Sequence, residues 1–211
     1  MATTTTHYGF DIPQSTDLVK DGATAIATLG QDIDTAMNTA LGTNKAGMVL
    51  LNTTSFSGVA SQSVNNVFTS TYTNYKVLFR LSAATADTAI SLRTRASGTD
   101  KSTNYYYGGA QGIFTGTNST WAGNNVSSWD MGSIDTSNAG IANAYSIDFF
   151  SPVPTVTTII NMQCWTQQTS GNTLWVSMSG VQNEQVTCDG FSIISSAGNI
   201  SGVVRVYGYN D

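Results

Sequence analysis

From Gly47 onward, short apolar or alternating runs of residues are separated by clusters of Gly, Asn and Ser, and this pattern constrains the fold most strongly. The segment 76–81 alternates partly between apolar and polar residues, which is typical of a strand with one buried face. Turn signals such as Ser97-Gly98 separate the runs. Many short strands with such punctuation predict an antiparallel β-sandwich or jelly roll over residues 47–211.

The apolar runs of this region predict individual strands, whereas the stretch 116–140 is rich in Gly, Asn and Ser. We interpret that stretch as long surface loops that contain Trp121 and Trp129. No internal repeat is evident. The strands are expected at residues 48–54, 66–70, 76–82, 89–95, 105–115, 144–150, 156–165, 173–181, 185–187, 190–195 and 203–207.

Before the β region, residues 15–46 are predicted to form a helical segment. Ser15 or Thr16 can cap the helix at its start, and Gly42 can end it. Small and apolar residues recur at alternating steps of three and four, which predicts a seam between helices over about three heptads. We expect an oligomeric bundle, with a homotrimer favoured; one helix packed on its own domain is the alternative. The seam residues are Val19, Gly22, Ile26, Leu29, Ile33, Ala36 and Ala40.

The first 14 residues are predicted to be an extended leader. A segment this short cannot bury its own aromatic side chains, so we expect it to dock on a neighbouring subunit. Packing against its own body is the alternative. The candidate anchoring residues are His7, Tyr8, Phe10, Ile12 and Pro13.

Charged residues make up only 10% of the chain, against about 25% in a typical soluble domain. Thr, Ser, Asn and Gly fill the difference, a composition common in extracellular β proteins and virion subunits. The net charge of −5, without any Lys/Arg cluster, argues against nucleic acid as a partner. No apolar run approaches the ~20 residues that span a bilayer, so membrane insertion is not expected.

The residues that support common enzyme chemistry are sparse. His7 is the single histidine and Glu184 the single glutamate. A glycan depolymerase needs two carboxylates across a sugar; Asp130 and Asp135 could pair, although isolated loop acids are the favoured interpretation. Cys164 and Cys188 could form one bridge, but two buried thiols are favoured. We therefore predict no enzyme activity and no catalytic, cofactor or metal site.

Aromatic residues are the best candidates for receptor contact. Tyr105, Tyr106 and Tyr107 lie on both sides of one predicted strand, so at least one side faces solvent or an interface unless both faces are covered. Trp121 and Trp129 lie in predicted polar loops. Exposed Tyr and Trp side chains suit carbohydrate or protein surfaces. Ordinary packing in the sandwich core is the alternative for all five residues.

Three stretches of the chain, taken in order, carry a resemblance to known proteins. The stretches comprise residues 8–10 and 12–13 leading into 16–22, 26 and 29–30, residues 67–77 with 92–93, and residues 190–194 with 198–202 and 204–209. The first resembles the N-terminal attachment segment of many phage minor tail and tail-fibre proteins, and the other two resemble the β-rich distal domain of such proteins.

This resemblance implies a virion structural protein, made in the host cytoplasm and assembled on the particle. It implies an N-terminal anchor on other virion proteins, trimeric assembly and a body that meets the host surface or covers the capsid. A tail-fibre or receptor-binding subunit that contacts a host glycan or surface protein is the leading hypothesis. A capsid decoration or head-fibre protein that stabilises the shell is the alternative, and a glycan depolymerase is a distant third.

Overall fold

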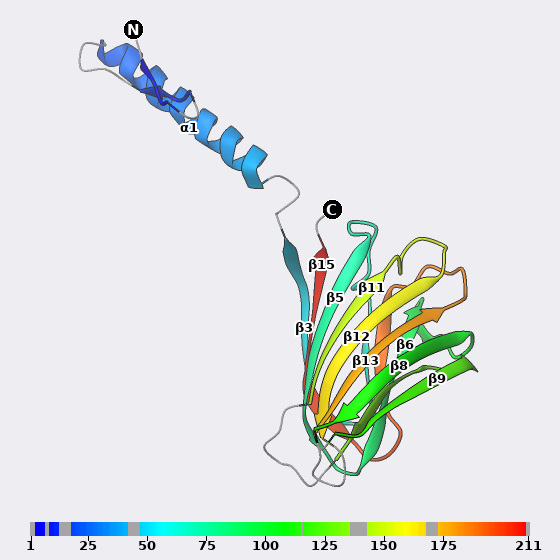
Figure 1. Cartoon of the computed structure of the whole chain (residues 1–211). Helices are drawn as coiled ribbons and strands as arrows, with labels where there is room; N and C mark the ends of the chain where they lie inside the picture. Colours follow the sequence, from blue (N-terminus) through cyan, green and yellow to red (C-terminus); the bar gives the residue numbers. More distant parts are fainter. Residues whose placement is uncertain are drawn as a thin grey trace. The chain divides into compact units, whose positions relative to one another are not determined.

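The computed structural model describes residues 3–6, 9–12, 18–41, 47–114, 116–135, 143–167 and 173–209. The chain divides into two compact units, residues 1–47 and residues 48–211. Their elements are drawn in Figure 1.

The N-terminal unit begins with a small hairpin of β1 (Thr3–Thr4) and β2 (Asp11–Ile12), which pair antiparallel. The backbone N–H of Thr5 donates to the Phe10 carbonyl at 2.9 Å, and the Thr5 hydroxyl accepts from the Phe10 N–H at 2.9 Å. Gly9 adopts φ +68°, which a glycine tolerates in such a turn. The described part of the leader therefore reverses direction, which differs from the extended leader that the sequence predicts.

Helix α1 (Val19–Leu41) follows the hairpin and has Asp21 in its first turn, where the helix dipole favours an anion. The predicted capping residues Ser15, Thr16 and Gly42 lie outside the described residues. Much of the predicted seam is exposed: the exposed fraction is 94% for Val19 and 63% for Ile26. Helix α1 thus presents an apolar stripe that its own unit leaves largely uncovered.

The body is built from the strands after residue 47. Their bounds are β3 (Met48–Val59), β4 (Ser61–Val64), β5 (Asn74–Ala84), β6 (Thr88–Ala96), β7 (Thr99–Asp100), β8 (Tyr105–Ile113), β9 (Asn118–Val126), β10 (Trp129–Ile134), β11 (Asn143–Phe150), β12 (Thr158–Gln167), β13 (Thr173–Gln182), β14 (Gly190–Ser195) and β15 (Ile200–Tyr209).

The described strands of the body form two antiparallel sheets in a sandwich-like arrangement. The larger sheet has eight strands in the order β3-β15-β5-β11-β12-β13-β8-β9. The smaller has five, in the order β10-β6-β14-β4 with β7 paired to β6. Figure 1 shows the larger sheet as a curved layer, with β6 of the smaller sheet behind it. This confirms the predicted mainly β fold with one helix near the N-terminus.

The structure corrects three sequence predictions within the body. The stretch 116–140, predicted as loops, contains strands β9 and β10. The segments 66–70 and 185–187, predicted as strands, belong to no sheet. Val67 and Phe68 instead both donate their backbone N–H to the Asp189 carbonyl, so this apolar run is a loop that closes the core. Propensity alone does not distinguish such a buried loop from a strand.

The core lies between the two sheets and is rich in aromatic side chains. The ring of Phe68 lies 4.7 Å from that of Tyr75 and 5.0 Å from that of Phe149, centroid to centroid. Fully burying a large apolar side chain contributes about 1.5–3 kcal/mol. Cys164 and Cys188 are buried and free, which confirms the interpretation of two buried thiols.

Candidate functional site on the outer face of the larger sheet

The eight-stranded sheet turns one face to the core and one face outward, because successive side chains of a strand point to opposite sides. Strand β12 shows this alternation clearly. Ile160, Met162 and Cys164 are buried, whereas Ile159 and Trp165 are 45% and 49% exposed. We call the side that carries Ile159 and Trp165 the outer face.

Strand pairing orders the side chains of the outer face into rows that run across the strands. Directly opposed residues of neighbouring strands lie side by side on the same face. Three rows cross β5, β11, β12 and β13 in that order: Arg80-Ala144-Trp165-Trp175, Leu78-Ser146-Gln163-Ser177 and Lys76-Asp148-Asn161-Ser179.

The first row ends in an aromatic cluster. The ring of Trp165 stacks on that of Phe114, with 5.0 Å between centroids and 24° between planes. Trp175 lies beside Trp165 on β13, and a Cβ added to Gly112 would fall 2.2 Å from its indole Nε1. The Trp175 indole therefore lies over the bare backbone of Gly112. Phe114, Trp165 and Trp175 together are called the aromatic platform.

A hollow of about 420 Å³ adjoins the aromatic platform. Ala144, a small residue, lies between the larger side chains of Trp165 and Arg80 in the first row, which leaves room for the hollow. Arg205 from β15 also lines it. Among the described residues that line this hollow, none is acidic. The lining comprises Leu78, Phe79, Arg80, Ala144, Tyr145, Ser146, Gln163, Trp165, Val203 and Arg205.

A second hollow of about 390 Å³ continues along the sheet and shares Ser146 and Gln163 with the first. Its side chains are polar. The Ser179 hydroxyl donates to Asn161 Oδ1 at 2.6 Å, so the amide N–H groups of Asn161 face elsewhere. We call the two hollows together the outer groove.

An ion pair closes the far end of the second hollow. Lys76 Nζ lies 3.0 Å from Asp148 Oδ2, and the Tyr209 hydroxyl donates to Asp148 Oδ1. Burial, and then the hydrogen bond to the Asp148 carboxylate, raise the pKa of Tyr209 to about 12. The Asp148 carboxylate is thus bound by Lys76 and Tyr209, whereas no ion pair between described residues involves Arg80 or Arg205.

The predicted receptor-contact residues do not lie together on this face. Tyr105 and Trp129 are fully buried and pack edge to face, 4.8 Å between centroids, so their assignment to receptor contact is wrong. Trp129 is buried because it begins β10, which pairs with β6, and Tyr105 takes the inward phase of β8. Tyr106, Tyr107 and Trp121 are half-buried. Tyr107 and Trp121 are packed against the core near the β9 edge, and receptor contact by these three residues stays a prediction.

Sequence reasoning missed Trp165 and Trp175. A signal was present, because Trp165 takes the outward phase of β12, which Asn161 and Gln163 also occupy. A tryptophan among the outward-facing polar residues of a strand indicates either a ligand site or an interface. The pairing that brings Trp175 beside it joins two different strands, and a single sequence does not fix that register.

Of the predicted anchoring residues, Phe10 and Ile12 are described, and Ile12 is 40% exposed. His7, Tyr8 and Pro13 lie outside the described residues. The seam residues of α1 are all described. Phe10 lines a shallow hollow with Ile33, so the hairpin covers a part of the apolar stripe.

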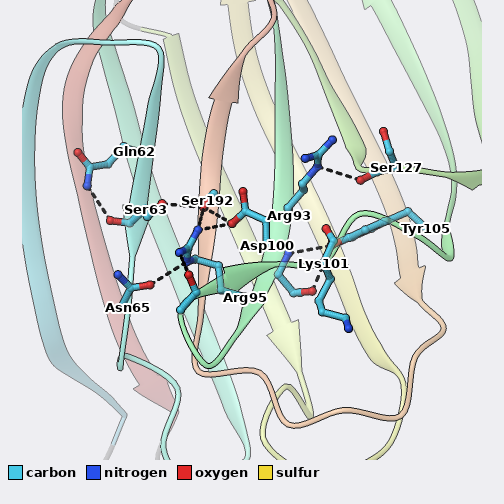
Figure 2. A network of polar contacts seen from close by, with 12 residues as sticks. Gln62, Ser63, Asn65, Arg93, Arg95, Asp100, Lys101, Tyr105, Ser127 and Ser192 are labelled. Carbon is cyan, nitrogen blue, oxygen red and sulfur yellow. Dashed lines mark hydrogen bonds and ion pairs between the residues drawn. The ribbon is translucent and has the colours of Figure 1, made fainter.

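A polar network in the smaller sheet has the residue types of a nucleophile and an acid (Figure 2). The Ser192 hydroxyl donates to Asp100 Oδ1 at 2.7 Å and accepts from Arg95 Nη1 at 2.9 Å. The Ser63 hydroxyl lies 3.0 Å from the Ser192 hydroxyl, and Arg95 forms an ion pair with Asp100. Ser192 is fully buried, so a substrate does not reach its hydroxyl in this structure. The network ties β4, β7 and β14 to β6.

Asp130 lies in β10, and Asp135 follows the last residue of that strand. Asp130 Oδ1 accepts the backbone N–H of Gly132 at 3.0 Å, where the pairing of β10 with β6 shifts register. Asp135 is buried, with 7% of its surface exposed. Across the described ranges, no three His, Cys, Asp or Glu side chains form a group that could hold a metal ion. No helix among the residues described is long and apolar enough to cross a membrane.

Comparison with known proteins yields no relative: no protein-family model, curated protein or solved structure matches the chain.

Proposed function

We propose that the chain is a structural subunit of a bacteriophage virion, in particular a tail-fibre or receptor-binding subunit. The N-terminal unit attaches to other virion proteins and assembles three copies of the chain. The β body meets a glycan or protein of the host surface. The resemblance of three stretches of sequence to phage tail proteins supports this proposal.

The structural observation that carries the proposal is the uncovered apolar stripe of α1. Val19, Ile26 and Ile33 are 94%, 63% and 40% exposed. A water-facing stripe of this kind is the seam of a helical bundle when its residues recur at heptad spacing. An assembling helix followed by a β body is the organisation expected of a short fibre subunit.

The outer groove gives the body a surface suited to host contact. It combines exposed aromatic rings with hydroxyl and amide side chains, and binding sites typically consist of an apolar lining with a few polar groups. The low charge of the chain agrees with a surface built for exposure outside the cell.

The first test is the mass of the full-length protein in solution. The wild type is expected to be a trimer, and the double variant Ile26→Lys/Ile33→Lys a monomer, because charges in the seam repel one another. The matched control Gln31→Lys/Asn38→Lys adds the same charge at exposed positions outside the seam and should stay trimeric. A monomeric wild type would refute the proposed assembly through the seam of α1.

The second test places the chain on the particle. Antibodies against the body are applied to purified phage particles that encode this chain and are located by electron microscopy. Label at the tail supports the proposed subunit. Label over the capsid favours the decoration or head-fibre alternative, and particles without label would refute a virion role.

A further inference from the structure

The outer groove places an aromatic ring, two arginines and neutral hydrogen-bonding groups around one hollow, and this combination specifies a class of ligand. Resting on the proposed function, we propose that the groove binds a carboxylate-bearing sugar of a host-surface glycan. The sugar ring stacks on Trp165, its carboxylate pairs with Arg80, and its hydroxyl groups bond to Gln163 and Ser146.

Trp165 supplies an exposed aromatic surface for the sugar ring. About half of this indole is exposed, although it belongs to a strand whose inward residues form the core. Phe114 stacks on it and Trp175 lies beside it, so the ring is held in place before any ligand binds. A rigid exposed indole offers a flat apolar surface that suits the C–H face of a sugar ring.

Two arginines supply positive charge for the carboxylate of the sugar. Arg80 and Arg205 line the hollow on the side away from Trp165, in a chain whose net charge is −5. The acid of this face, Asp148, is held by Lys76 and Tyr209 at the far end of the groove. A guanidinium binds a carboxylate through two parallel hydrogen bonds, which a neutral sugar cannot match.

The distance between Trp165 and Arg80 leaves room for one sugar unit. Ala144 lies between Arg80 and Trp165 in the same row, so the two larger side chains are two strands apart. Neighbouring strands lie about 4.8 Å apart, which separates these positions by roughly 10 Å. A sugar ring over Trp165 therefore directs a ring substituent across Ala144 to the guanidinium.

The remaining polar groups are suited to sugar hydroxyls. Ser146 and Gln163 belong to both hollows, and Asn161 has its carbonyl oxygen occupied by Ser179. Its two amide N–H groups are thus the donors left for a ligand. A second sugar unit can extend from the first hollow into the polar one.

The test is equilibrium binding of the full-length protein to four polymers of similar length. Polygalacturonate and polysialic acid carry carboxylated sugars, dextran carries neutral sugars, and polyglutamate carries carboxylates without sugar rings. We expect binding to at least one carboxylated polysaccharide and at least tenfold weaker binding to dextran and polyglutamate. The preferred polysaccharide distinguishes a uronic-acid from a sialic-acid source.

Two variants locate the site. Trp165→Ala and Arg80→Gln are each expected to weaken binding about tenfold or more, because each removes one of the two strong contacts. Ile159→Ala, an exposed apolar residue of the same strand, and Arg93→Gln, an equal change of charge on β6, serve as controls and should bind like the wild type. Circular dichroism checks that each variant keeps its fold.

The proposal is overturned if neither carboxylated polysaccharide binds, if polyglutamate binds equally well, or if the two site variants bind like their controls. A loss of trimer mass in Trp165→Ala would also overturn it, because the platform would then be a contact between subunits. Antibody labelling of particles does not depend on the groove. Labelled tails without polysaccharide binding would therefore refute the glycan inference and leave the proposed function standing.

Discussion

Tyr105→Phe tests a side chain that completes backbone hydrogen bonding at the end of the pairing between β6 and β7. That pairing includes Arg95, and the backbone N–H of Lys101 also donates to the Thr94 carbonyl at 2.9 Å. The backbone N–H of Thr94 donates to the Tyr105 hydroxyl at 3.0 Å. That hydroxyl in turn donates to the Lys101 carbonyl at 3.0 Å. The Tyr105 hydroxyl thus bridges the backbones of Thr94 and Lys101 where the pairing ends (Figure 2).

The expected loss of stability follows from the burial of Thr94 and Tyr105. Thr94 and Tyr105 have no exposed surface, so water does not replace the lost hydroxyl. A buried donor left without a partner costs about 1–3 kcal/mol. Because the backbone N–H of Thr94 and the carbonyl of Lys101 both lose a partner, we expect Tyr105→Phe to lower the free energy of unfolding by about 2–3 kcal/mol. For a body of this size the melting temperature should fall by roughly 4–12 °C.

The assay is urea unfolding followed by tryptophan fluorescence, which reports on the body alone because all four tryptophans lie after residue 47. Tyr106→Phe is the matched control, since it removes the same atom from a half-exposed ring and should change the stability by less than about 0.5 kcal/mol. Equal stability of the two variants would refute the role assigned to the Tyr105 hydroxyl.

Three further predictions concern the rest of the body. Gly190→Ala should destabilise the body by about 3 kcal/mol or more in the same urea assay, because its Cβ would fall 2.0 Å from the backbone oxygen of Val64; unchanged stability would contradict this close approach. Since the pKa of Tyr209 is raised to about 12 from 10 in the unfolded chain, its contribution to stability is complete below pH 10 and is lost as the pH rises through about 12. If the stability of Tyr209→Phe falls as steeply as that of the wild type when the pH rises above 10, the assigned contribution of Tyr209 is refuted. Cys164 and Cys188 should react with a thiol reagent only after unfolding, because burial raises the pKa of both thiols and keeps them from the reagent. Fast reaction of the native protein, or the absence of two reactive thiols in denaturant, would contradict this prediction.

The sequence pattern predicts those elements whose structure depends on residues close together in the chain. Strand β14 (Gly190–Ser195) has the bounds predicted for it, because its flanking residues are turn formers. The helix and the two buried thiols were also predicted. Each of these features follows from residues close together in the sequence, or from the apolar character of one side chain.

The features that failed prediction depend on distant partners. Trp129 is buried because β10 pairs with β6, whose opposed residue Leu92 lies 37 positions earlier in the chain (129 − 92). The surrounding Gly and Asn residues predict a loop, and tertiary pairing overrides that preference. The outer groove likewise depends on the register of β12 and β13, so Trp165 was not selected as a site residue.

The order of the larger sheet has a consequence for synthesis on the ribosome. Strand β15 lies between β3 and β5 and is the single sheet partner of β3 among the described strands. The first strand of the body must therefore wait until residues 200–209 have emerged, whereas α1 is complete much earlier. Such distant pairing slows folding. Under the proposed assembly, nascent chains on one messenger would associate through their helices before any of their bodies closes.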